Sequence, residues 1–123
     1  TAWFNLLSQF VCRMHDMQIV HRDLSAGNLI LSPQVDGSIK PMVIDIGRAW
    51  VWQGPGSRLS GWKRLQDLIR IAYKLQWHDR TAFIHCYEAH MEATLPPLWR
   101  MAFRYYDYKQ LFKKQLRAWR TRG

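Results

Sequence analysis

The spacing of apolar residues in the first 46 positions predicts one helix followed by a short hairpin. Residues 3–15 carry apolar side chains at steps of three and four, which is typical of a helix with one apolar face. Residues 17–20 predict a short extended segment that leads into a polar stretch. Two runs rich in isoleucine, leucine and valine, residues 28–31 and 42–46, predict strands.

The second half of the chain is predicted to be helical. Glycine, proline and serine interrupt residues 47–61, which we expect to form a loop. Residues 62–77 give the clearest helical periodicity, and residues 81–94 predict a further helix that ends before two prolines. Residues 98–122 predict one or two basic, aromatic helices. The sequence therefore predicts a single domain, residues 1–123, of the α+β class that is mainly α-helical.

The hairpin is expected to bring polar residues together at its open end. If Asp36 and Gly37 form a two-residue turn, Asn28 lies opposite Asp45. Two prolines near the turn disturb the ladder, because proline cannot donate to it, so this pairing is one of several that the sequence allows. An antiparallel hairpin still places the start of its first strand beside the end of its second.

Asp23 lies five residues before Asn28, and the intervening glycine and small residues let the segment fold back. Asp23, Asn28 and Asp45 can then converge on one site. Their carboxylate and amide oxygens are hard ligands of the kind that Mg²⁺ prefers. The alternative for each residue is a turn position bonded to local backbone, but the three together, beside His21, favour a site.

The segment HRDLSAGN (residues 21–28), followed by VIDIG (residues 43–47), resembles the catalytic and metal-binding segments of the protein-kinase-like fold. Within that superfamily the chain is most similar to the bacterial lipopolysaccharide kinases, which phosphorylate inner-core heptose or Kdo sugars. The similar features are VIDIGRA, the short loop after it, and WKRLQDLIRIAYKL (residues 62–75). The resemblance covers about residues 1–75 and implies a protein-kinase-like C-terminal lobe with a catalytic-loop β-hairpin and several helices.

The resemblance also implies ATP and Mg²⁺ as cofactors and a role for each polar residue. Asp23 would orient or deprotonate the acceptor hydroxyl, and Asn28 and Asp45 would be the magnesium ligands. Asp67 would be a buried acid that braces the catalytic loop from the next helix; the alternative is an ordinary exposed helix aspartate. Two further residues are expected to support the loop. His21 would have a structural role, and Arg22 would pair with an anion.

Two departures from the kinase pattern change what we expect of the chain. Ile46 replaces the usual phenylalanine, and only fourteen residues separate Gly47 from Trp62, so a regulated activation segment is not expected. Before His21 there is no glycine-rich phosphate loop, no strand lysine and no partner glutamate. We therefore expect that the N-terminal nucleotide lobe is absent and that residues 1–123 alone have little or no kinase activity. The chain begins with threonine, which fits either a fragment or a degenerate protein.

The net charge of +9 belongs to the second half of the chain and predicts an anionic partner. Residues 98–123 hold eight lysines or arginines, one acid and interleaved aromatic residues. This pattern is typical of a surface that meets anionic lipid or a phosphorylated glycolipid; the alternative is a solvated helical face whose aromatic residues pack on the core. The expected contact residues are Arg104, Lys109, Lys113, Lys114 and Arg117. RNA would also suit the pattern, but no nucleic-acid motif is present.

The expected partners are a lipopolysaccharide core sugar or another glycolipid acceptor, with peripheral contact to an anionic membrane. The sequence has no apolar run long enough to span a membrane and no signal peptide. A cytoplasmic protein is expected, and the resemblance implies a peripheral place at the inner face of the inner membrane. His78, His85 and His90 have no metal spacing and are expected to be surface or core histidines.

Three functions compete. The first is a lipopolysaccharide-kinase-like sugar kinase. The second is another small phosphotransferase, of the RIO or aminoglycoside-kinase type. The third is a non-catalytic, basic, kinase-like binding module. The sequence leaves the acceptor sugar, its hydroxyl position and the oligomeric state open.

Overall fold

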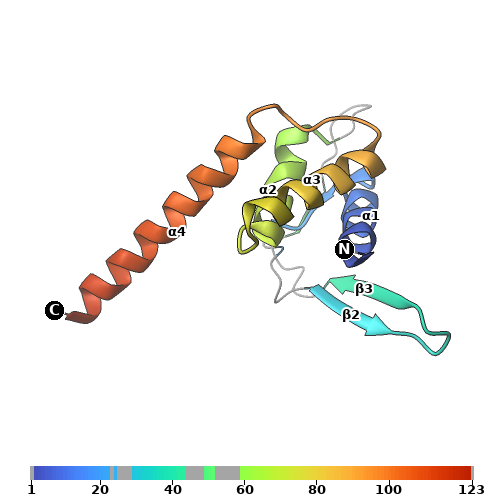
Figure 1. The fold of residues 1–123 in the computed structure, drawn as a ribbon, viewed down its shortest axis with the longest axis horizontal. Helices are drawn as coiled ribbons and strands as arrows, with labels where there is room; N and C mark the ends of the chain where they lie inside the picture. Colours follow the sequence, from blue (N-terminus) through green and yellow to red (C-terminus); the bar gives the residue numbers. More distant parts are fainter. Residues whose placement is uncertain (1, 23, 25–28, 44–48, 52–58, 123) are drawn as a thin grey trace.

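The structure, a computed structural model, describes residues 2–22, 24, 29–43, 49–51 and 59–122. Three helices form its body, and a fourth extends away from it (Figure 1): α1 (Ala2–Asp16), α2 (Gly61–Ala72), α3 (Trp77–Met91) and α4 (Trp99–Arg122). The strands in the described part of the chain form two antiparallel pairs, β1 (Ile19–Val20) with β4 (Trp50–Val51), and β2 (Leu29–Pro33) with β3 (Ile39–Val43). This mainly helical architecture with small sheets agrees with the predicted α+β class.

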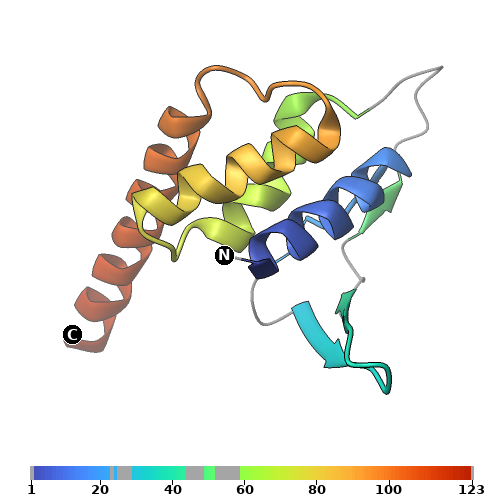
Figure 2. The same ribbon diagram turned by 45° about the vertical axis from the view of Figure 1, so that its right-hand side comes forward.

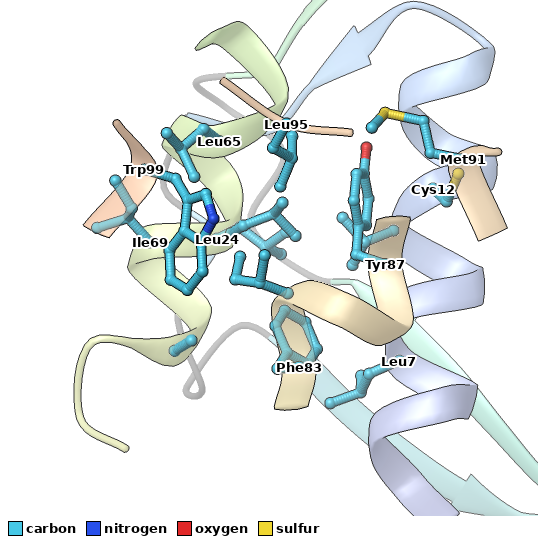
Figure 3. Packing of buried hydrophobic residues seen from close by; sticks show 14 of the residues in the cluster. Leu7, Cys12, Leu24, Leu65, Ile69, Phe83, Tyr87, Met91, Leu95 and Trp99 are labelled. Atoms are coloured by element: carbon cyan, nitrogen blue, oxygen red, sulfur yellow. The ribbon is translucent and has the colours of Figure 1, made fainter. Parts of the chain in front are cut away.

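The hydrophobic core lies where α1, α2 and α3 pack together (Figure 2). The rings of Phe4 on α1 and Phe83 on α3 meet edge to face, with centroids 5.9 Å apart. Leu24, from the polar stretch between β1 and β2, is fully buried and lies among Leu65 and Ile69 of α2 (Figure 3). Burying a leucine side chain contributes about 1.5–3 kcal/mol, so the chain is anchored in the core directly after Asp23.

The predicted helix over residues 3–15 is confirmed by α1, but the predicted boundary between the next two helices is wrong. The turn falls at residues 73–76, and α3 begins at Trp77. Arg80, which lies between the two predicted helices, belongs to the first turn of α3 and is buried. Its guanidinium binds both carboxylate oxygens of Asp107 on α4 at 2.8 Å and the carbonyl oxygen of Tyr73. These partners come from other elements, so local periodicity does not reveal them.

The hairpin of β2 and β3 exists as predicted, but its register is wrong by one residue. Leu29 pairs with Val43, whereas a two-residue turn at Asp36 and Gly37 would pair Leu29 with Ile44. The predicted pair of Asn28 with Asp45 lies outside the described residues. The cause is a three-residue loop instead of a two-residue turn: Gln34 donates its N–H to the Ser38 carbonyl, and Gly37 has a φ of 88°. That left-handed glycine is typical of a three-residue hairpin loop.

Both prolines that were expected to border the turn lie inside the strands. Pro33 pairs with Ile39 and Pro41 with Leu31. Hydrogen-bonded and non-hydrogen-bonded pairs alternate along an antiparallel ladder, and Gln34 belongs to a hydrogen-bonded pair. Pro33 and Pro41 therefore both fall in non-hydrogen-bonded pairs, in which the N–H groups point away from the partner strand. Proline therefore removes no ladder bond at either position, which is why the strands extend toward the turn.

α4 is one continuous helix of 24 residues. Its first turns belong to the core, because Trp99 and Phe103 are buried and their rings contact each other edge to face. From Leu111 to Thr121 every described side chain is exposed. Both ribbon views show this part of α4 leading away from the other helices (Figures 1 and 2).

Candidate active-site loop and its supporting network

The three residues predicted to carry the chemistry, Asp23, Asn28 and Asp45, lie outside the described residues. The structure does describe the segments that flank them: β1 and the two residues after it, His21 and Arg22, then Leu24 in the core. The described part of the candidate site therefore consists of the residues that hold the backbone next to Asp23.

Asp67 on α2 holds the backbone immediately before Asp23. Its side chain is fully buried, so it is not an ordinary exposed helix aspartate. Its Oδ2 accepts a hydrogen bond from the His21 amide at 3.0 Å, and its Oδ1 accepts one from the Arg22 amide at 2.9 Å. Hydrogen bonds to an ionised carboxylate are about twice as strong as neutral ones. One side chain thus fixes two successive peptide groups.

Arg22 has an unusual backbone conformation, with a φ of 72°. The left-handed region is unfavourable for a residue with a Cβ and costs on the order of 1–3 kcal/mol. The Asp67 bond to its amide, together with the burial of neighbouring His21 and Leu24, holds the backbone there. The exposed Arg22 side chain therefore extends from a backbone position that Asp67 holds in place.

Asp67 is itself held by a buried histidine that the sequence reasoning missed. His15, at the end of α1, places Nε2 2.8 Å from Asp67 Oδ2 and Nδ1 2.7 Å from the Tyr87 hydroxyl. A neutral His15 satisfies both bonds, donating from Nε2 to the carboxylate and accepting the Tyr87 proton at Nδ1. Burial lowers the pKa of His15, although the Asp67 hydrogen bond opposes this shift. The neutral ring is therefore the form that suits the site.

A buried arginine completes the network. Arg64 on α2 donates to the Tyr87 hydroxyl at 3.1 Å, to the Leu59 carbonyl at 3.0 Å and to Asp16 at 3.0 Å. Burial raises the pKa of Tyr87, which keeps its hydroxyl protonated. The network thus links α1, α3 and α2 and ends on the amides of His21 and Arg22, directly before Asp23 in the candidate loop, residues 21–28.

The sequence contained a weak signal for this network. His15 follows Val11 by four residues, so it lies on the apolar face of α1. Arg64 precedes Leu68 by four residues and Asp67 by three, which places all three on one face of α2. A polar residue on an apolar face indicates a buried partner, but the spacing does not identify which one.

Arg22 lines two adjoining hollows of the surface. One, of about 510 Å³, lies between α2 and α4; the other, of about 390 Å³, lies between α2 and the β1–β4 pair. Gln66 also lines both. A third hollow, of about 600 Å³, lies between Tyr73 and the middle of α4.

The predicted anionic contact residues are all on α4, and the structure does not bring them to one place. Lys109 lines the hollow beside Arg22. The third hollow is lined by three of the others, Lys113, Lys114 and Arg117. Arg104 is exposed, with its guanidinium 5.8 Å from the centroid of the Trp77 ring. Within the described residues, no helix is long and apolar enough to cross a membrane.

Among the residues that the structure describes, no group of three His, Cys, Asp or Glu side chains could hold a metal ion. His78 and His85 are exposed, and His90 Nε2 lies 2.7 Å from Asn5 Oδ1. Asn28 and Asp45, which the kinase pattern implies as magnesium ligands, lie outside the described residues; an amide and a carboxylate oxygen are of the ligand type that Mg²⁺ prefers.

Comparison with known proteins adds one match. Residues 2–87 match the lipopolysaccharide kinase (Kdo/WaaP) family, a span that includes the candidate loop, Asp67 and the whole buried network. No curated protein and no solved structure matches the chain. Because the match covers more than half of the sequence, the chain belongs to the lipopolysaccharide kinase (Kdo/WaaP) family.

Proposed function

We propose that this chain carries the acceptor and metal side of an ATP-dependent kinase that phosphorylates a sugar hydroxyl of the lipopolysaccharide core. The observation that carries the proposal is the Asp67 carboxylate, which binds the amides of His21 and Arg22 next to Asp23. Phosphoryl transfer asks a protein mainly to position groups and neutralise charge. A buried carboxylate that holds the two backbone positions before Asp23, within a segment that matches the family, contributes to that positioning.

In this proposal each residue has one task. The Asp23 carboxylate accepts the proton of the sugar hydroxyl as the new O–P bond forms and the bond to ADP breaks. Asn28 and Asp45 would hold Mg²⁺, which neutralises the charge on the phosphate oxygens. Asp67 and His15 touch no substrate; they keep the loop in one geometry. A misplacement of about 1 Å at such a loop reduces the rate on the order of 100-fold.

The family match favours a lipopolysaccharide acceptor over the RIO or aminoglycoside-kinase alternative. The test is transfer of labelled phosphate from ATP to three acceptors: core oligosaccharide, an aminoglycoside and a protein. It uses the protein in the full extent that its coding region allows, because residues 1–20 contain no glycine-rich loop. Labelling of the oligosaccharide that is lost in Asp45→Ala supports the proposal. Preference for another acceptor contradicts it, and absence of all transfer favours a binding module.

The partner proposal concerns α4, which we place on an anionic lipid surface at the inner face of the inner membrane. Exposed apolar side chains recur along the side of α4 opposite Phe103, and they are Met101, Tyr105, Tyr108, Phe112 and Trp119. Residues 109–122 hold six lysines or arginines and no acid. Each cation near such a surface contributes about 1 kcal/mol, and an apolar face with flanking cations is typical of an interfacial helix.

A further inference from the structure

The third hollow, of about 600 Å³, lies where the turn between α2 and α3 meets the middle of α4. Figure 2 shows α4 passing this turn, which leads from the green helix α2 into the yellow helix α3. Tyr73 and Lys74 line the hollow from the turn, and residues between Asp107 and Arg117 line it from α4. Two separate segments therefore form it, and its volume is within the range of small-molecule sites, about 300–1,000 Å³.

The charge of the third hollow is positive. Asp107 is the one acid among the described residues that line it, and Arg80 already binds both of its carboxylate oxygens at 2.8 Å. Four cations line the same hollow, and none of them pairs with a carboxylate in the described part of the chain; they are Lys74, Lys113, Lys114 and Arg117. Convergent cations whose charge is not neutralised by a neighbouring acid favour an anionic ligand.

The third hollow and the exposed apolar side chains lie on opposite sides of α4. Lys114 follows Tyr105 by nine residues, and Arg117 follows Tyr108 by nine. Nine residues make about two and a half turns of an α-helix, so the two members of each pair point in opposite directions. When the apolar side of α4 rests on lipid, the hollow opens away from the lipid. Its ligand is therefore expected among water-soluble anions, a choice that rests on the proposed lipid contact.

The spacing of these cations suits more than one phosphate group. Lys113 and Arg117 are four residues apart, which is about 6 Å of helix rise, and Lys74 comes from the turn. Together they can engage two phosphate groups, the arginine bidentately and the lysines as point charges. We propose that the third hollow binds a water-soluble compound with two linked phosphate groups. The ligand joins the exposed half of α4 to the turn between α2 and α3, and it touches none of the residues assigned to the kinase reaction.

Pyrophosphate is the probe, because it consists of two linked phosphates alone. Its binding to the 123-residue chain is measured by amide chemical-shift titration at fixed ionic strength, without Mg²⁺, so that the metal ligands proposed at Asn28 and Asp45 do not contribute. We expect the signals of Lys74 and of residues 110–117 to shift, and inorganic phosphate to bind about threefold to tenfold more weakly. Equal binding of inorganic phosphate, shifts confined to other signals, or no binding of pyrophosphate would each overturn the proposal.

Matched variants locate the site. Lys74→Gln and Arg117→Gln, one on each wall of the hollow, should each weaken pyrophosphate binding about threefold to tenfold. Lys109→Gln removes the same charge from α4, but this lysine lines the hollow beside Arg22, so binding should change by less than about twofold. Equal loss in Lys109→Gln, or no loss in Lys74→Gln, means that α4 attracts anions without a site at the turn, which refutes the proposal.

Vesicles separate a soluble phosphate compound from a lipid headgroup, which carries the same phosphate chemistry. Sedimentation with phosphatidylglycerol vesicles should be the same for Lys74→Gln as for the parent chain, because the hollow opens away from the lipid. If Lys74→Gln weakens vesicle binding about threefold or more and leaves pyrophosphate binding unchanged, the hollow holds a headgroup and the proposal is wrong. If pyrophosphate binds as expected and the parent chain does not sediment with vesicles, the site stands and the proposed lipid contact of α4 is wrong.

Discussion

Replacing Asp67 with asparagine tests the support of the candidate loop. The carboxylate accepts three hydrogen bonds, from His15 Nε2 at 2.8 Å and from the amides of His21 at 3.0 Å and Arg22 at 2.9 Å. Asparagine has the same shape but only one oxygen, so its NH₂ group must face at least one of these donors. Each lost bond to a charged acceptor costs about 1.5–3 kcal/mol. Since one bond is lost and the others weaken, we expect a destabilisation of about 2–4 kcal/mol.

Urea unfolding followed by far-UV circular dichroism measures this loss, and hydrogen exchange locates it. At least one of the His21 and Arg22 amides should exchange faster in Asp67→Asn than in the parent chain, because asparagine keeps only one of the two acceptor oxygens. The control is Asp79→Asn, in the first turn of α3 and partly exposed, which should change stability by less than about 0.5 kcal/mol. An equally small change in Asp67→Asn, with unchanged exchange at both amides, would refute the bracing argument.

Three further predictions follow from the network and from α4. Tyr87→Phe removes the hydroxyl that lies between His15 and Arg64, and urea unfolding should show a loss of about 1–3 kcal/mol because buried polar groups lose their partner; an unchanged midpoint would contradict the network. Since burial lowers the pKa of His15 in the fold, the unfolded chain binds more protons just below the ordinary value of 6.5, so stability should fall as pH drops through that region. His15→Gln should reduce that slope in unfolding measured across pH, and an equal slope in both proteins would show that His15 does not cause it. On α4, Phe112→Ser with Trp119→Ser should weaken sedimentation with phosphatidylglycerol vesicles about tenfold or more, while Val35→Ser, an exposed apolar change on the hairpin, should not; equal binding to phosphatidylcholine vesicles would contradict the role of charge.

The fold could be predicted as far as local periodicity determines it. α1 follows from its apolar spacing, and the hairpin from two strand-like runs around a turn. The register could not be predicted, because Asp36 and Gly37 fit a two-residue turn and the observed three-residue loop equally well. A one-residue difference in loop length shifts every pair of the ladder.

The supports of the site could be predicted only where the family resemblance named them. Asp67 was expected as a brace from its place in the helix after the loop. His15 and Arg64 were not expected, because a histidine or arginine is normally solvated unless it finds partners, and here those partners lie up to 72 residues away in the sequence. For the exposed half of α4 the sequence left two interpretations open, since its aromatic residues could form a surface or pack on the core as Trp99 does.

The most direct test of the proposed function is the rate of phosphate transfer to core oligosaccharide in Asp23→Asn. The protein is again taken in the full extent of its coding region, with Asp79→Asn as the control for losing a carboxylate elsewhere. If Asp23 accepts the proton of the sugar hydroxyl, kcat should fall about 100- to 10,000-fold. A kcat within about twofold of the parent protein, with transfer still dependent on ATP, would contradict the assignment of this loop as the catalytic centre.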